Sequence, residues 1–200
     1  MGTLIRVQAP QTNLVEVDFA KKFLHVDTSA DDDRIRALLD MAEQRLDGED
    51  GLLGRSLLPQ TWRLELPAWP ATPYCLPMPP VTSVTSVQYL DSAGDLQTLP
   101  AGLYRVTGYG GDDVAIDRAI SKTWPTAYAG DLPDAVRITF DAGYEDAQSP
   151  ANLAVPEPIR QAAIMMAQVW YDGLSLEHIP DAVWRLINPY RVDRLGKGHG

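Results

Sequence analysis

The chain has 200 residues, a hydrophobic fraction of 45% and a formal net charge of −10. The length and the hydrophobic fraction indicate a globular protein with one substantial core or two small lobes. The negative charge argues against a protein that binds nucleic acid by neutralising its phosphates. The apolar runs are too short for a membrane-spanning helix, and the single cysteine, Cys75, excludes an internal disulfide and a multi-cysteine metal site. We expect a protein of a reducing compartment that has no secretory signal, membrane contact, metal or cofactor.

The charge is unevenly distributed. Residues 27–50 hold nine acids and three bases, whereas residues 184–200 hold four bases and one acid. An acidic body with a basic tail indicates that the tail meets a different surface.

The N-terminal part predicts two helices. Residues 13–26 form a short amphipathic pattern, and the next apolar stripe has helical spacing at Ile35, Leu38, Leu39, Ala42 and Leu46. Thr28 or Ser29 is suited to cap this second helix, and three aspartates at 31–33 favour its first turn. The triple aspartate is better explained as a solvated helix start than as a cation site.

The middle of the chain predicts strands. Residues 60–66 and 135–144 alternate apolar and polar side chains, and the first should bury Trp62, Leu64 and Leu66. Prolines at 67, 70, 73, 77, 79 and 80 exclude a helix there. Residues 83–99 predict a β-hairpin that turns at 91–95, and the strand at 103–106 is expected to continue the same sheet. We expect four to five short antiparallel strands.

Helices return near the C-terminus. Residues 155–173 carry an apolar stripe with prolines in the first turn and Gly173 at the end, and residues 180–192 form a final short helix that ends at Asn188–Pro189. The last eight residues, 193–200, should be a flexible tail. The order of helices, strands and helices predicts an α+β fold rather than an alternating one.

No catalytic constellation stands out. His25, His178 and His199 lie far apart, no nucleophile elbow or phosphate loop is present, and the glycine-rich stretch 108–113 precedes an extended segment rather than a helix. A hydrolase that uses scattered carboxylates would need a converging acid pair in a cleft and is a remote alternative. We therefore expect no enzyme activity and no catalytic, cofactor or metal residues.

Five segments in order resemble a known family. They are "GRSLLPQTWRLELPAWP", "LPMPPVTSVTSVQYLDSAGDLQTLP", "VRITFDAGY", "VPEPIRQAAIMMAQVWYDG" and "LINPYRV". Together they are similar to the head–tail connector (adaptor) proteins of long-tailed bacteriophages, prophages and gene transfer agents. The resemblance runs from about residue 14 to 192.

The resemblance implies a structural role in a virion or phage-like particle. Such adaptors form a ring, typically twelve-fold, beneath the capsid portal at the head–tail junction, and they are made in the bacterial host cytoplasm. The ring extends the channel through which DNA passes without sequence-specific binding, and it presents a platform to a stopper or another neck or tail protein. A head-completion stopper or a tail-completion protein is the alternative.

The resemblance also implies a domain plan. Residues 1–192 would form a single adaptor domain, a helical bundle (helices about 14–51 and 156–188) with a β-rich insertion at about 60–144. Three surface hypotheses follow. The first is a portal-docking segment at Trp184, Leu186, Ile187, Tyr190 and Arg191. The second is a hairpin that contacts neighbours through Asp91, Ser92, Gly94 and Asp95. The third is a channel-facing set of acids, where negative charge keeps DNA mobile, at Asp32, Asp33, Asp40, Glu43 and Asp47.

Overall fold

The computed structural model describes residues 2–71, 73–128, 130–145 and 154–192. The chain divides into two compact units. One is β-rich and consists of the N-terminal residues up to Gln11 together with Pro59–Gly143. The other is helical and consists of Thr12–Leu58 with the residues from Tyr144 onward. Helices and antiparallel strands are thus segregated into different units, which confirms the predicted α+β class.

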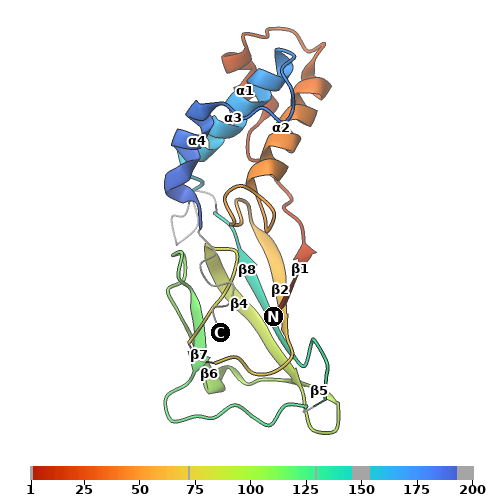
Figure 1. Cartoon of the computed structure of the whole chain (residues 1–200), viewed down its shortest axis with the longest axis vertical. Helices are drawn as coiled ribbons and strands as arrows, with labels where there is room; N and C mark the ends of the chain where they lie inside the picture. Colours follow the sequence, from red (N-terminus) through yellow and green to blue (C-terminus); the bar gives the residue numbers. More distant parts are fainter. Residues whose placement is uncertain (1, 72, 129, 146–153, 193–200) are drawn as a thin grey trace. The chain divides into compact units, whose positions relative to one another are not determined.

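The β-rich unit contains two antiparallel sheets (Figure 1). The larger has the strand order β1-β2-β8-β4-β5, formed by Thr3–Gln8, Gln60–Leu66, Val136–Ala142, Val81–Leu90 and Leu96–Thr98. The smaller has the order β3-β7-β6, formed by Tyr74–Cys75, Ala115–Arg118 and Tyr104–Thr107. A short 3₁₀ helix, η1 (Ala101–Leu103), lies between β5 and β6.

The alternation of apolar and polar residues along the strands determines which side chains form the core of this unit. Trp62, Leu64 and Leu66 of β2 are buried, and the alternate residues of the neighbouring β8, Val136, Ile138 and Phe140, are also buried. Their polar neighbours lie on the other face, where the Asp141 carboxylate accepts hydrogen bonds from Thr61 (2.7 Å) and Ser83 (2.9 Å). One charged acceptor of β8 thus links both neighbouring strands.

The strand count expected from the sequence was wrong. Between residues 60 and 142 the described residues form seven strands rather than four or five, because the short β3 and β7 lack a clear alternation with flanking turn signals. An eighth strand, β1, lies outside that range and was not expected. The strand at 103–106 does not continue the hairpin's sheet, because Pro100 and η1 redirect the chain and β6 pairs with β7 in the smaller sheet.

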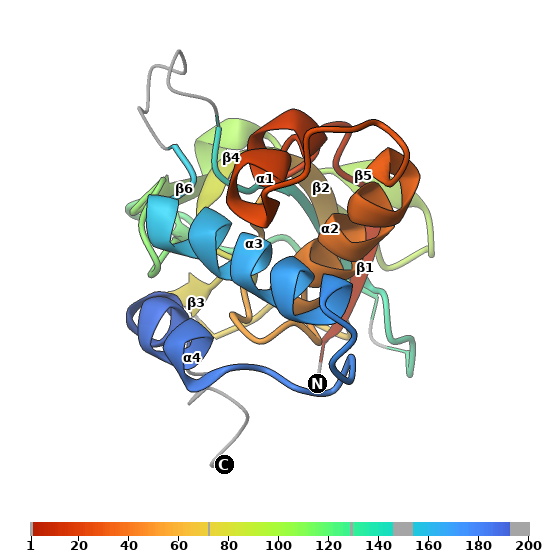
Figure 2. The ribbon, with the colours of Figure 1, turned by 90° about the horizontal axis from the view of Figure 1, so that it is seen from above.

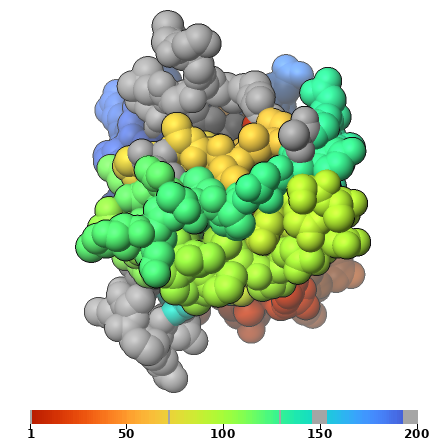
Figure 3. Space-filling model, turned by 90° about the horizontal axis from the view of Figure 1, so that it is seen from below, coloured from red at the N-terminus to blue at the C-terminus, as the bar shows by residue number. Residues whose placement is uncertain are grey.

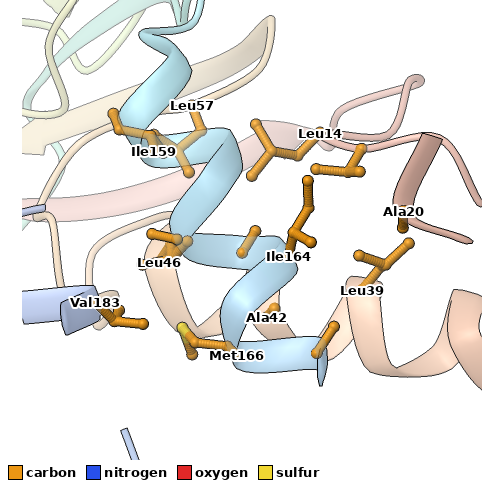
Figure 4. Packing of buried hydrophobic residues seen from close by; sticks show 14 of the residues in the cluster. Leu14, Ala20, Leu39, Ala42, Leu46, Leu57, Ile159, Ile164, Met166 and Val183 are labelled. Carbon is orange, nitrogen blue, oxygen red and sulfur yellow. The ribbon is translucent and has the colours of Figure 1, made fainter. Parts of the chain in front are cut away.

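The helical unit contains α1 (Val17–Leu24), α2 (Asp32–Leu46), α3 (Glu157–Tyr171), α4 (Asp181–Ile187) and the 3₁₀ turn η2 (Asn188–Tyr190). Helix α3 is central, because it contacts α1, α2 and α4 (Figure 2). Its apolar stripe meets those of the other helices in one core, where Ile159, Ile164 and Met166 lie close to Leu39, Leu46 and Val183 (Figure 4).

The start of α2 differs from the sequence prediction. Asp31, rather than Thr28 or Ser29, occupies the N-cap position, and its side chain makes no capping hydrogen bond. Residues 29–32 instead close a turn through the bond from Asp32 N to Ser29 O (3.3 Å). The Asp31 carboxylate accepts a hydrogen bond of 2.8 Å from the Tyr171 hydroxyl, so it ties α2 to the end of α3.

Candidate functional site

The functional candidates considered for this chain are groups of surface residues. Among the described residues no group of three or more His, Cys, Asp or Glu side chains is arranged to hold a metal ion. None of the helices in the described ranges is both long and apolar enough to cross a bilayer. The candidate functional features are therefore the three sets of residues singled out in the sequence, together with surfaces that the sequence did not reveal.

The hairpin tip is built around one carboxylate. Asp91 Oδ1 accepts hydrogen bonds from the backbone N–H groups of Ala93 (2.9 Å) and Asp95 (3.0 Å), and Oδ2 accepts one from Gln97 Nε2 (2.9 Å). Gly94 has a φ of 89°, a left-handed conformation that favours glycine. The turn expected at 91–95 is therefore present and ordered by its own residues.

These bonds favour the ionised form of the Asp91 side chain. The hydrogen bond from Gln97, followed by the backbone bond from Asp95, holds the pKa of the Asp91 carboxyl below its ordinary value. Ser92, Gly94 and Asp95 are exposed. The tip thus exposes residues around a carboxylate that hydrogen bonds of the tip hold in place.

The hairpin lies on a broader face of the β-rich unit. The N–H of Tyr128 donates to the Leu90 carbonyl (2.8 Å), so the long segment after β7 runs beside the turn end of β4. Figure 3 shows the hairpin (yellow-green) next to this segment (green) on one face. Trp69 and Trp124 stack with their ring centroids 4.6 Å apart, and Trp69 Nε1 donates to the Pro125 carbonyl (2.8 Å), which fixes the segment to the loop that follows β2.

The predicted channel-facing acids share one side of α2. With about 100° between successive residues, Asp32, Asp33, Asp40 and Glu43 fall within an arc of about 100°, and Asp47 follows at the C-cap. Two of them are partly neutralised, since Asp32 pairs with Lys21 (2.7 Å) and Asp33 pairs with Arg36 (3.0 Å).

Two other acids serve the fold of the helical unit. Glu43 Oε2 accepts a hydrogen bond from Leu14 N (2.9 Å), and Asp47 Oδ1 accepts one from Leu57 N (2.7 Å). Each carboxylate thereby satisfies the backbone of a loop that carries buried leucines. The acidic side of α2 thus combines structural acids with the more solvent-accessible Asp33 and the half-buried Asp40.

The C-terminal segment is fastened to its own unit. Ile187 is fully buried in the helical core, so its side chain is not available as a docking surface in this structure. Trp184, Leu186 and Tyr190 are half-buried and pack on the same core. Arg191 is exposed, although its Nε donates to the Leu52 carbonyl (3.2 Å) and its guanidinium lies 5.9 Å from the centre of the Trp184 ring.

The segment stays attached to the helical unit up to its last described residue, Val192. Val192 N donates to the Leu53 carbonyl (2.9 Å), which continues the attachment to the loop after α2. The predicted flexible tail, 193–200, lies outside the described residues. Four of the five predicted docking residues are thus half-buried or exposed, and they lie along α4, η2 and the residue that follows η2.

Sequence analysis missed several exposed apolar side chains. Ile120 is 81% exposed in the segment after β7, and Leu174 and Leu176 are each more than half exposed after α3. An isolated apolar residue in a polar loop gives no periodic signal, so only the structure distinguishes it from a core residue. Strand β1, at the edge of the larger sheet, was not predicted either, because its residues lack a clear alternation of apolar and polar side chains.

Comparison with known proteins gives matches among solved structures only. No protein-family model and no curated protein matches the chain. A chain from the "neck of empty GTA particle computed with C6 symmetry" matches with a TM-score of 0.73 and 23% identity, covering 99% of this chain and 100% of that one.

Two further structures agree with this match. A chain from the "virion of native gene transfer agent (GTA) particle" has a TM-score of 0.71 and 25% identity, and covers 98% of both chains. A chain from the "neck of native GTA particle computed with C12 symmetry" has a TM-score of 0.65 and 24% identity, covering 99% of this chain and 100% of that one. Over nearly its whole length, this chain has the fold of proteins found in gene transfer agent particles.

Proposed function

We propose that this chain is a structural protein of the neck of a phage or phage-like particle, and specifically a head–tail connector (adaptor). In this proposal it forms a ring, twelve-fold, beneath the portal, extends the DNA channel and provides the platform for the next neck or tail protein. The observation that carries the proposal is the end-to-end similarity to a GTA neck chain, which covers 99% of this chain and 100% of that one.

The symmetry of the related structures supports a ring. Two of the matching chains come from necks computed with C6 and C12 symmetry, and six-fold symmetry is contained in twelve-fold symmetry. Closed cyclic assemblies arise when one surface of a subunit binds a different surface of the next. The same proposal includes one adaptor domain over residues 1–192, built as a helical bundle with a β-rich insertion. It also includes a role without catalysis.

The docking segment is proposed to contact the portal through Trp184, Leu186, Tyr190 and Arg191. Three of these are amphipathic or apolar side chains of α4 and η2 that pack on the helical core, and the fourth is an exposed cation. Aromatic residues and arginine are favoured at the centres of protein interfaces. Deleting all residues after Asp181 would not test the docking segment alone. The deletion also removes Val183 and Ile187, which are fully buried in the helical core, so the chain would lose stability as well.

A charge reversal tests the docking segment more sharply. Arg191→Glu should weaken binding to portal rings while the chain stays folded. Arg118→Glu, an exposed arginine of the β-rich unit, is the matched control and should bind normally. Equal binding of both variants would remove Arg191 from the proposed interface.

The proposal as a whole is tested by mixing the purified chain with isolated portal rings of the same particle and imaging the product by electron microscopy. A second ring stacked coaxially on the portal supports the adaptor. A folded chain that does not bind the portal but binds tail tubes on a parallel grid would instead support the tail-completion alternative.

A further inference from the structure

We propose that neighbouring copies of this chain associate through the two open edges of the five-stranded sheet, with β1 of one copy adding to β5 of the next. The inference rests on the proposed function, since it names the contact that would build the ring. The occupant of each edge is therefore a second copy of this chain.

The larger sheet has two unlike edges. Within the described ranges, its order, β1-β2-β8-β4-β5, leaves β1 paired only with β2, and β5 paired only with the last three residues of β4. A strand edge exposes unpaired N–H and C=O groups and is a template for another strand. Two different edges on one sheet suit a head-to-tail contact, which leads to rings when the rotation closes.

The hydrogen bonds of the hairpin assign the outer groups of β5. Asp91 N donates to Asp95 O (2.9 Å), and Leu99 N donates to Val87 O (2.8 Å). Because bonded residues alternate along an antiparallel strand, Leu96 and Thr98 direct their backbone N–H and C=O groups away from β4. All three residues of β5 are exposed, and Leu96 is 46% exposed despite being apolar.

The same alternation can be followed across the sheet to β1. Leu90 N donates to Ala135 O (2.9 Å), which fixes which residues of β8 face β4. When this alternation is followed through the registers of β8, β2 and β1, the backbone N–H and C=O groups of Thr3 and Ile5 face β2. Those of Leu4 face outward, away from the sheet. The strand therefore has an outer edge in its regular half, before the register shift that follows Arg6.

The sequence of β1 gives this edge little protection. Natural edge strands avoid association with charged side chains, prolines, bulges or very short length. Strand β1 has six residues, "TLIRVQ", without lysine or proline, and Val7 is 53% exposed. Its one charged side chain, Arg6, lies with its guanidinium 4.8 Å from the centre of the Trp62 ring. Its irregularity lies at one end only, so residues 3–5 remain a regular strand of high β-propensity.

The topology, together with a ring axis that runs along the strands, sets the direction of the proposed contact. Every neighbouring pair in the five-stranded order is antiparallel, so β1 and β5 of one copy run in the same direction. A rotation axis along the strands keeps that direction in the next copy. The added pair β5–β1 between copies is therefore parallel.

One experiment uses proline as a selective block. Thr98→Pro removes an N–H that faces away from β4, so the hairpin keeps its own ladder while the outer edge loses a donor. Thr98→Ala is the matched control, because it changes the side chain and keeps the N–H. We expect Thr98→Pro to reduce self-association, measured by mass photometry at equal concentration, by about tenfold, the effect of losing one or two backbone hydrogen bonds. Equal association of both variants would contradict the inference.

A cross-linking experiment separates this inference from the proposed function. Thr3→Cys and Thr98→Cys are introduced together in a Cys75→Ser background, since Cys75 is an exposed free thiol. A bismaleimide should give a ladder of oligomers with both cysteines and none with either alone, because the contact joins unlike edges. Monomers at every concentration would overturn the inference, because the contact is assigned to the chain by itself.

The outcomes of the two proposals are distinguishable. A coaxial ring on the portal without the cross-linked ladder would leave the adaptor function standing and reject the edge contact. A ladder from a chain that does not bind portal rings would do the reverse.

Discussion

Arg55 and Tyr144 are joined by a hydrogen bond of 2.5 Å from Nη1 of the guanidinium to the phenol oxygen, and both residues are buried. They lie in the two segments of the helical unit that flank residues 59–143, just before β2 and just after β8. Tyr144 N also donates to Leu57 O (3.3 Å). These bonds hold the two chain segments together where the long β-rich excursion begins and ends.

Tyr144→Phe should therefore lower the free energy of unfolding of the helical unit by about 1–3 kcal/mol, because it removes an acceptor from a buried guanidinium and changes little else. Urea denaturation followed by the helical circular dichroism signal measures this change. Tyr109→Phe, on a half-exposed side chain of the β-rich unit, is the control and should have no effect. An unchanged midpoint for Tyr144→Phe would show that the bond adds nothing to stability.

The acids of α2 should divide into two classes. Asp47→Ala removes the acceptor of the Leu57 N–H and should destabilise the chain by about 1–3 kcal/mol. Asp33→Ala removes an exposed ion pair with Arg36 and should cost less than about 1 kcal/mol.

The more accessible acids of α2 can also be tested for a role in the DNA channel. If the acidic side of α2 faces the DNA channel, Asp33→Lys with Asp40→Lys should leave ring assembly intact and slow DNA release from assembled particles, because added positive charge retains DNA. Particles that release DNA at the normal rate would place these acids outside the channel.

The hairpin tip should loosen in acid. The pKa of Asp91 is lowered by its hydrogen bonds, first of all the one from Gln97, so the stability they provide is present above the ordinary aspartate pKa of about 4. It is lost as the pH falls through the lower pKa of the folded state. Hydrogen exchange at the amides of Ala93 and Asp95 should therefore accelerate in acid beyond its intrinsic pH dependence.

Asp91→Asn provides the comparison. It should raise exchange at both amides near neutral pH and abolish the extra acid dependence. A Gly-rich replacement of residues 91–95 should go further and weaken assembly with its neighbours without unfolding the chain. Normal assembly with that replacement would exclude a role for the tip in contacts between copies.

The contact between Tyr171 and Asp31 predicts the opposite pH dependence. The hydrogen bond to Asp31, together with desolvation, raises the pKa of Tyr171 above its ordinary value of about 10. The stabilisation is complete below that ordinary value and is lost as the pH rises through the raised pKa. Stability should thus fall more steeply at alkaline pH in the wild type than in Tyr171→Phe, and parallel curves in denaturant titrations would contradict this.

The sequence predicted those elements whose signal is local. Trp62, Leu64 and Leu66 alternate with polar residues, and the structure buries all three in β2. The stripe of Ile159, Ala162 and Met166 likewise becomes the buried side of α3. In both cases the periodicity of apolar side chains is that of the element, so neighbouring residues suffice for the prediction.

Features that depend on distant partners escaped the sequence. Strand β1 exists because β2 lies beside it, and β3 has only two residues and pairs with β7. Ile187 looked like a docking residue because a short amphipathic helix gives no indication of what covers its apolar side, which here is the unit's own core. The same limit applies to Glu43 and Asp47, whose roles depend on loops far along the chain.

The most direct test of the account is electron microscopy of the purified chain mixed with isolated portal rings of the same particle. The account predicts a second, coaxial ring of this chain stacked on the portal, with twelve copies around the channel. A folded chain that leaves the portal rings bare would contradict the adaptor function.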